Sequence, residues 1–227
     1  VDAVLVQDTG LLLRLRACAP ALPLHASTQM SLHTPSGAAA VQEAGMTRAV
    51  LAREMTAKEI RETRGAVSIE LESFVHGALC MSVSGQCYFS AMLGSRSGNR
   101  GMCAQTCRLP FSCEGGTGHD LSLRDLSLIQ RLSELEAAGV MSAKIEGRMK
   151  RPEYVAAAVS ACRRAADGEP IPPRLLENLE AVFSRSGFTS GFFDAPGRGR
   201  TRALFGTRRE EDAAAATGAV FGELHEL

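Results

Sequence analysis

Residues 48–74 read RAVLAREMTAKEIRETRGAVSIELESF and contain one strand–helix–strand unit. The apolar start of this stretch predicts a buried strand. Thr56 and Glu59 then have the spacing of a capping box, which begins a helix, and Gly65 is placed to end it. A second apolar run, 67–74, predicts the next strand. Because a strand, a helix and a strand in this order form a parallel βαβ unit, the stretch predicts an α/β fold.

The same alternation extends on both sides of this stretch. It predicts strands at 1–8, 25–29, 48–54, 67–74 and 141–145. It predicts helices at 11–17, 35–45, 56–63, 123–138 and 152–166. Repeated strand–helix units with polar residues just after the strands are typical of a (β/α) TIM-like barrel, whose active site lies at the carboxyl ends of its strands. A doubly wound open sheet is the structural alternative, but no glycine-rich nucleotide loop follows any predicted strand.

The composition is that of an ordinary globular protein. The chain has 227 residues, with 25 Lys and Arg against 25 Asp and Glu, 45% hydrophobic residues and 22% charged residues. Such a chain has no net charge to attract nucleic acid or membrane, and it is too apolar to be disordered. No apolar run reaches the roughly 18 residues that a membrane-spanning helix needs. We therefore expect a cytoplasmic protein that does not contact the membrane.

Two regions depart from the strand–helix pattern. The segment 77–119 is rich in glycine, serine and cysteine, and loops of this length inside a domain are usually functional. A later proline cluster marks a second change of composition. We predict a partial barrel over 1–168, with the cysteine-rich loop inserted after one strand, and a C-terminal extension over 169–227. The extension would hold a helix at 175–183 and an arginine-rich tail at 197–209.

Four of the seven cysteines are crowded into the inserted loop. Cys80, Cys87, Cys103 and Cys107 have the spacing C-x6-C-x15-C-x3-C. Four thiolates from one loop can bind an iron–sulfur cluster or a tetrahedral zinc ion. Zinc ribbons generally use tight C-x2-C pairs, which are absent here, and flanking glycines leave room for backbone amides to approach sulfur, so the pattern favours a cluster. Ordinary buried cysteines are the structural alternative, and Cys113 is a second candidate for the position of Cys107.

Five short stretches around the cysteines and the last predicted strand carry a family resemblance. They read ESFVHGALC at 72–80, SGQCYFS at 84–90, GNRGMCAQTCR at 98–108, KIEGR at 144–148 and PEYV at 152–155. Together they resemble the signature of the collagenase-like peptidases, peptidase family U32. The resemblance covers nearly the whole chain. It implies an internal fragment, which begins at Val1 inside a strand and lacks the amino-terminal part of the barrel.

The resemblance implies a function other than the one in the family name. Other members of this family resemble oxygen-independent hydroxylases, which bind a four-iron, four-sulfur cluster through four cysteines. They modify RNA bases or the ubiquinone ring, with prephenate implicated as the hydroxyl source. The run RGMCAQTCRLP at 100–110 is most similar to the ribosomal RNA cytidine hydroxylase branch. Carried over to this sequence, the cluster ligands are Cys80, Cys87, Cys103 and Cys107.

Chemistry of this kind needs cationic groups for an anionic donor or an RNA phosphate, and groups that move protons. We predict that substrate is bound by Gln29, Arg53, Lys144 and Arg148. We predict that protons are transferred, or ligands oriented, by Glu54, Glu72, His76 and Glu146. Structural alternatives are open for several of them. Lys144 and Glu146 could form an ion pair, His76 could hydrogen-bond backbone, and Gln29 could close a turn.

Ribosomal or transfer RNA is the expected substrate. The cysteine-rich loop contains arginines that could contact phosphates and aromatic rings that could stack on bases: Arg96, Arg100, Arg108, Tyr88, Phe89 and Phe111. A solvated loop without an RNA-binding role is the alternative explanation of this composition. A peptide is the alternative substrate that the family name gives, but the sequence has no H-E-x-x-H and no G-x-S-x-G motif. A third hypothesis is a non-catalytic binding module that is stabilised by its metal.

Overall fold

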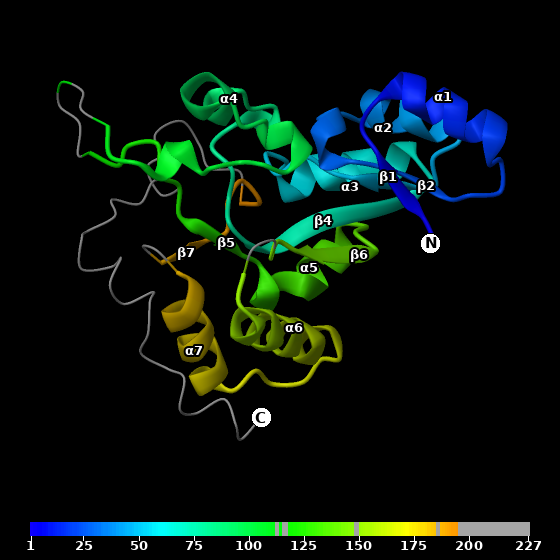
Figure 1. Ribbon diagram of the computed structural model, residues 1–227. Coiled ribbons are helices and arrows are strands. Elements are labelled where there is room, and N and C mark those ends of the chain that lie inside the picture. The colour runs from blue at the N-terminus through cyan, green and yellow to red at the C-terminus, as the bar shows by residue number, and fades with distance from the viewer. Residues whose placement is uncertain (112–113, 115–117, 148–149, 185–186, 195–227) are drawn as a thin grey trace.

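The computed structural model describes residues 1–111, 114, 118–147, 150–184 and 187–194 (Figure 1). Within them one seven-stranded sheet is formed by β1 Val4–Val6, β2 Leu24–Ala26, β3 Arg48–Val50, β4 Glu70–Gly77, β5 Asp125–Ser127, β6 Ser142–Ile145 and β7 Phe188–Thr189. The α-helices are α1 Thr9–Cys18, α2 Pro35–Glu43, α3 Ala57–Ala66, α4 Phe89–Gly94, α5 Leu132–Ala137, α6 Pro152–Ala166 and α7 Pro173–Phe183. Single turns of 3-10 helix are η1 Thr28–Met30, η2 Val83–Gly85, η3 Gly98–Arg100, η4 Thr106–Arg108 and η5 Ile129–Arg131.

Five of the strands form a parallel sheet in the order of the sequence. β1 pairs with β2, β2 with β3, β3 with β4, and β4 with β6, all in parallel. These five strands are the ones that the sequence predicts, so the α/β class with a mostly parallel sheet is confirmed. β5 pairs antiparallel with the end of β4, and β7 pairs with β5. None of the described helices has the length and hydropathy to cross a bilayer.

Local sequence signals begin the helices that join the strands. At α3 the capping box is complete, because the Thr56 hydroxyl accepts from the backbone N–H of Glu59 at 3.2 Å and the Glu59 carboxylate accepts from the N–H of Thr56 at 2.8 Å. The side chains of Asp8 and Thr34 cap α1 and α2 in the same manner. α3 continues past Gly65 to Ala66, slightly beyond its predicted end.

The predicted helix at 123–138 is wrong in its first half. Residues 125–127 form β5, and the α-helix covers only residues 132–137. Leu126 pairs with Gly77 of β4, and the N–H of Leu128 donates to the carbonyl of Val75 at 2.7 Å. This backbone pairing is a tertiary contact that the local spacing of apolar residues cannot reveal, because that spacing fits both a strand and a helix.

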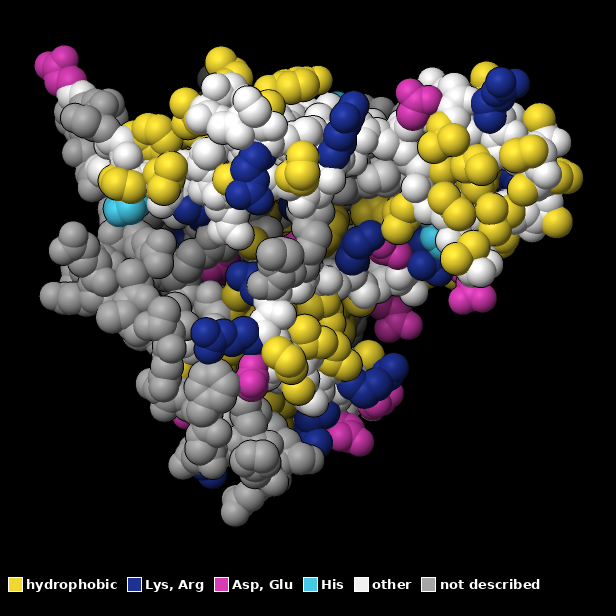
Figure 2. Space-filling view, viewed as in Figure 1, with side chains coloured by type: hydrophobic (Ala, Val, Ile, Leu, Met, Phe, Trp, Pro, Cys, Tyr) yellow, Lys and Arg dark blue, Asp and Glu magenta, His cyan; other side chains and the backbone are white. Residues whose placement is uncertain are grey.

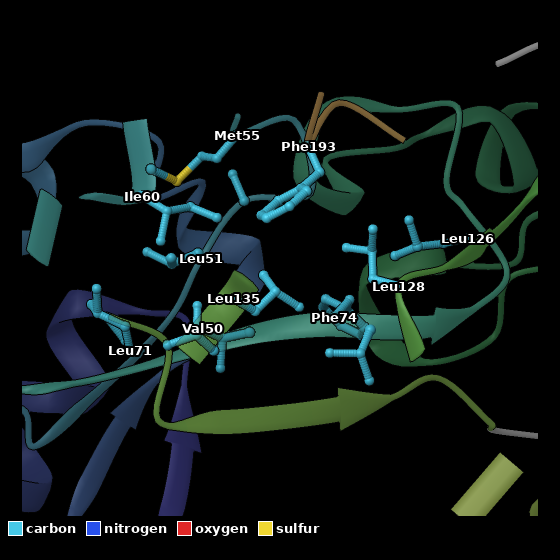
Figure 3. Close-up of a cluster of buried hydrophobic side chains, with 14 of the residues drawn as sticks. Val50, Leu51, Met55, Ile60, Leu71, Phe74, Leu126, Leu128, Leu135 and Phe193 are labelled. Carbon is cyan, nitrogen blue, oxygen red and sulfur yellow. The ribbon is translucent and has the colours of Figure 1, made fainter. Parts of the chain in front are cut away.

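The apolar core lies between the sheet and its helices. Figure 3 shows Val50, Leu51, Leu71 and Leu135 at its centre and Phe193 beside Met55 and Ile60. The carbonyl of Phe193 accepts from the N–H of Ala57 at 3.0 Å, and α7 packs on α6. Residues from the predicted C-terminal extension therefore contribute to the same core. The predicted arginine-rich tail at 197–209 lies outside the described residues, and the division of the chain at residue 168 stays a prediction.

One face of the sheet carries a network of ion pairs, which we call the sheet-face network: Arg48, Glu70, Glu72, Ser142 and Lys144. Glu72 is buried and accepts from Lys144 at 2.8 Å, Ser142 at 2.9 Å and Arg48 at 3.0 Å. Burial works to raise the pKa of Glu72, but the bonds from Lys144 and Ser142 and the charge of Arg48 outweigh it and hold the pKa below its ordinary value. The network ties β3, β4 and β6 together.

β4 ends in a close backbone contact. Gly77 has a φ of +122°, and the N–H of Glu146 donates to the carbonyl of His76 at 2.8 Å. A Cβ on Gly77 would lie 2.5 Å from the carbonyl oxygen of Glu146 and 2.7 Å from its Cβ. Only glycine fits at this position, because both the backbone angle and the space exclude a side chain.

We predict that Gly77→Ala lowers the free energy of unfolding by about 3 kcal/mol, because it adds a strained φ and a steric clash. The matched control is Gly65→Ala in α3, where a Cβ meets no atom within 4 Å. That variant should be neutral or slightly more stable, since alanine favours a helix. Urea unfolding of both variants measures the difference, and equal stabilities would contradict the contact described above.

We predict that Glu72→Gln lowers the free energy of unfolding at pH 7 by about 3 kcal/mol, because it removes the buried carboxylate that pairs with both Arg48 and Lys144. The pKa of Glu72 is lower in the folded state, so its stabilisation is fully present above its ordinary pKa of 4.5 and is lost as the pH falls below that value. The difference in the free energy of unfolding between wild type and Glu72→Gln should therefore become smaller in acid.

Urea titrations at pH 7 and pH 3 test this pH dependence. Glu62→Gln is the control, because the Glu62–Lys58 pair is exposed and 3.7 Å long, and such pairs contribute little. If the difference in the free energy of unfolding between wild type and Glu72→Gln were the same at pH 3 as at pH 7, the stabilising role of the Glu72 charge would be contradicted.

Candidate active site at the cysteine segment

The cysteine segment, residues 78–111, lies over the carboxyl ends of β2 and β3. Gln29, which follows β2, donates to the carbonyl of Asn99 at 3.3 Å, and its own carbonyl accepts from the Gln86 side chain. Glu54, which follows β3, accepts from both the N–H and the hydroxyl of Ser84 at 2.7 Å. Figure 1 shows the segment and α4 on this side of the sheet. The segment therefore occupies the edge where parallel α/β folds place their sites.

The four cysteines of the segment are free thiols. Burial raises the pKa of the Cys107 thiol; the Arg108 charge opposes this, and the negative charges of Cys80, Cys103 and Cys87 raise the pKa further. Cys87 and Cys103 flank Gly98, because a Cβ on Gly98 would lie 3.5 Å from the Cys87 carbonyl oxygen and 3.8 Å from the Cys103 Cβ. Cys113 lies outside the described residues, so its candidacy as a ligand stays a prediction.

Backbone amides point at two of the sulfurs. The N–H of Phe89 donates to the Cys87 sulfur at 3.4 Å, and the N–H of Gln105 donates to the Cys103 sulfur at 3.3 Å. Hydrogen bonds to sulfur stabilise thiolates and tune the clusters that thiolates hold. Among the described residues, no group of three or more His, Cys, Asp and Glu side chains is arranged to hold a single metal ion.

Arg108 connects the two ends of the cysteine segment. Its guanidinium is buried and donates to the carbonyl of Leu79 at 2.7 Å, to the Ser122 hydroxyl at 2.9 Å and to the carbonyl of Leu123. Leu79 precedes Cys80 and Arg108 follows Cys107, so this side chain fixes the spacing between the two cysteines. The sequence offered Arg108 as a surface contact for phosphate, and the structure corrects this because the side chain is inside the protein.

Arg53 follows β3 and packs on Phe74 of β4. Its guanidinium carbon lies 4.0 Å from the centre of the Phe74 ring, and it forms no salt bridge with any described residue. Burial lowers the pKa of Arg53, and the negative charges of Cys80, Glu146 and Glu54 oppose that shift. Arginine stays protonated under such conditions. It is therefore a partly buried cation whose guanidinium packs on the Phe74 ring.

Two of the predicted site residues, Glu72 and Lys144, lie deeper in the fold. Lys144 pairs with Glu72 at 2.8 Å and does not form the ion pair with Glu146 that the sequence left open. Phe74 separates this pair from Arg53, because the Lys144 ammonium lies 5.5 Å from the same ring that Arg53 covers. Glu72 and Lys144 thus support the site from inside the sheet.

His76 points away from the cysteine segment. Strand alternation predicts that His76 lies on the same face of the sheet as Phe74. A bulge in β4 changes this, because Phe74 pairs with Lys144 of β6 whereas His76 pairs with Ile145, the residue directly after Lys144. The ring instead packs among aromatic rings, with centroids 5.8 Å from Tyr154, 5.7 Å from Phe183 and 5.1 Å from Phe188.

The environment of His76 is apolar. Burial lowers its pKa to about 4, and the charge of Asp125 opposes the shift. Neither ring nitrogen has a hydrogen-bond partner among the described residues, so the backbone bond considered from the sequence is absent there. A catalytic role for His76 stays a prediction, and its surroundings are those of a packed core residue.

Glu146 lies at the end of β6, next to Gly77, and its carbonyl accepts from the Tyr154 hydroxyl at 2.7 Å. Its negative charge opposes the lowering of the Arg53 pKa. Arg148 lies outside the described residues, so its predicted role is not addressed by the structure. The structure thus places Gln29 and Glu54 in contact with the cysteine segment and Arg53 against Phe74, and the roles predicted for these residues and for Glu146 stay predictions.

A separate cavity of about 930 Å³ opens on the helix-covered side of the sheet. Its lining includes Arg64, Glu136 and Met141, and none of the residues predicted for the site. The guanidinium of Arg64 bonds the carbonyls of Ile69 and Val67. This cavity lies apart from the cysteine segment.

Known proteins resemble the chain along most of its length. It is 36% identical over 217 residues to a tRNA hydroxylation protein of Bacillus subtilis, a match that covers 87% of this chain and 51% of that one. It is 39% identical over 200 residues to a 23S rRNA 5-hydroxycytidine synthase of Escherichia coli, covering 85% of this chain and 29% of the other. It is 35% identical over 172 residues to a collagenase of Porphyromonas gingivalis, covering 63% and 41%.

The chain therefore spans about half or less of the length of these relatives. The solved structure of a U32 peptidase aligns with 34% of this chain and 31% of its own, at 26% identity and a TM-score of 0.31, a partial match that does not bear on the fold. The family model for peptidase family U32 matches residues 1–202. The chain belongs to peptidase family U32.

Proposed function

We propose that this chain carries the cluster-binding part of an oxygen-independent hydroxylase that modifies a base of ribosomal or transfer RNA in the cytoplasm. The observation that carries the proposal is that Gln29 and Glu54 hold the cysteine segment over the carboxyl ends of the parallel strands, where backbone amides donate to the sulfurs of Cys87 and Cys103. The names of the tRNA and rRNA hydroxylation relatives support an RNA substrate.

The donor set fits an iron–sulfur cluster. Cys80, Cys87, Cys103 and Cys107 would be its ligands, and the amides of Phe89 and Gln105 supply hydrogen bonds to sulfur. Zinc is less well suited, because its four thiolates must converge at about 2.3 Å on one ion, and the described side chains form no such single-ion group. A bound four-iron, four-sulfur cluster would supply electron transfer at the site.

Arg53 is the proposed contact for an anionic hydroxyl donor, for which prephenate is the candidate. A guanidinium binds a carboxylate with two parallel hydrogen bonds, and the Phe74 ring holds it in place. In the reaction a base C–H becomes C–OH while the donor R–OH becomes R–H, so two electrons pass from the base to the donor. Glu146 is the proposed group for proton transfer.

Glu54 and Gln29 have a different proposed role. Both carboxylate oxygens of Glu54 accept bonds from Ser84, and Gln29 bonds Asn99 and Gln86. We assign these two residues to positioning the cysteine segment on the sheet.

The parallel strands are proposed to be the later part of a TIM-like barrel. The strand order β1-β2-β3-β4-β6 follows the sequence, as in such barrels. The charged sheet-face network on one face would then lie inside the closed barrel. The chain spans about half of the tRNA hydroxylation relative, so the activity is proposed for a longer protein.

The second candidate function is proteolysis. The family name and the collagenase relative favour it. A peptidase would cleave gelatin without iron, and its cysteines would matter only for folding.

We predict that the chain, purified without oxygen, contains about four iron and four sulfide per molecule and absorbs visible light as a thiolate-bound cluster does. Cys87→Ala should lose the absorption and the iron. Cys18→Ala is the matched control, because Cys18 is exposed on α1, outside the cysteine segment, and its iron content should equal that of wild type. Iron-free protein, or gelatin cleavage that survives Cys87→Ala, would favour the peptidase.

We predict that Arg53→Met keeps the full iron content and raises the KM for the anionic donor by about tenfold or more, the effect of losing a hydrogen bond to a charged group. The measurement is hydroxylated nucleoside from RNA incubated with prephenate, by mass spectrometry. An unchanged KM would remove Arg53 from donor binding, whereas lost iron would assign it to cluster assembly.

A further inference from the structure

The outer side of the cysteine segment exposes an aromatic ring and several apolar side chains. Tyr88 is 67% exposed, and Met92 and Met102 are 82% and 47% exposed. In Figure 2 hydrophobic side chains gather at the top of the view, over α4 and the segment, with Lys and Arg side chains beside them. Exposed apolar groups in this arrangement mark an interaction surface more often than a solvated one.

The charge of the segment has one sign. The sequence contains no Asp or Glu between Glu72 and Glu114, and its basic residues there are Arg96, Arg100 and Arg108. Arg108 is buried, whereas Arg96 and Arg100 are exposed. The Nε of Arg96 donates to the carbonyl of Met102 at 3.1 Å, which holds this guanidinium beside the apolar patch. A surface with cations and without carboxylates is complementary to a polyanion.

The structure separates the aromatic residues of the segment into two kinds. Phe89 and Phe111 stack on each other, with ring centroids 5.5 Å apart, and are partly buried. Tyr88 is exposed and follows Cys87 directly. It is therefore the ring that can accept a base, and a base stacked on it would lie next to the cysteines.

We propose that the face formed by Tyr88, Met92, Arg96, Arg100 and Met102, here called the docking face, binds single-stranded RNA. A base stacks on Tyr88, the two arginines contact phosphates, and the methionines pack against the neighbouring base or sugar. The RNA must be unpaired there, because a base inside a duplex has no free face to stack. This inference deepens the proposed function by naming how its substrate is held.

The test measures binding of a fluorescein-labelled, mixed-sequence single-stranded RNA of twelve nucleotides to the whole chain by anisotropy, without oxygen. Tyr88→Ala should weaken binding about tenfold, the loss expected for one stacked base, and Tyr88→Phe should restore it. Arg96→Ala and Arg100→Ala should each reduce the slope of log K against log salt by about 0.7.

Arg163→Ala is the matched control, because Arg163 is an exposed arginine of α6 that pairs with Asp167 and lies away from the segment. It should leave both affinity and salt slope unchanged, and all variants should keep the iron content of wild type. Wild-type affinity in Tyr88→Ala, or displacement of the RNA by gelatin, would overturn the docking face.

The two proposals fail separately. If the docking-face variants lose RNA binding but wild type forms no hydroxylated nucleoside, the docking face stands and the hydroxylase proposal does not. If hydroxylation proceeds and every variant binds RNA as wild type does, the docking face is overturned while the hydroxylase proposal stands.

Discussion

The pairing of β4 with three other strands is the constraint on which the rest of the structure depends. One edge of its eight residues pairs with β3, the other with β6, and its last two residues pair with β5. Glu72, near its middle, is bound by cations from β3 and β6 and so ties the same strands together through side chains. A buried carboxylate with several charged donors requires this register, because any other register leaves charges unpaired.

The end of β4 decides where the chemistry can lie. The bulge after Phe74 turns His76 into the aromatic core, and Gly77 lets the chain pass against Glu146 and leave the sheet. The cysteine segment that follows is held to the sheet by polar contacts, because Glu54 and Gln29 bond its turns and Arg108 joins its two ends. Few apolar contacts are needed when buried polar groups are satisfied in this way.

Much of this arrangement could be predicted from the sequence. The five parallel strands follow from short apolar runs separated by helices, and the capping box at Thr56 and Glu59 is present as its spacing indicates. The spacing of the four cysteines on a glycine-rich loop predicts one site, and their joint role as ligands stays a prediction. These features are local or repeat along the chain, and local patterns survive folding when tertiary contacts agree with them.

What only the tertiary structure decided involves residues far apart in the chain. Residues 125–127 form a strand because their backbone pairs with the end of β4. The spacing of their apolar residues fits a helix equally well. His76 packs among aromatic rings because of a bulge that strand alternation cannot reveal, and Arg108 is buried because three acceptors distant in the sequence surround it. The sequence by itself determined the α/β class of the fold and the family. The partners of each charged side chain were decided by packing, because a charge is buried only where the folded chain supplies its counterparts.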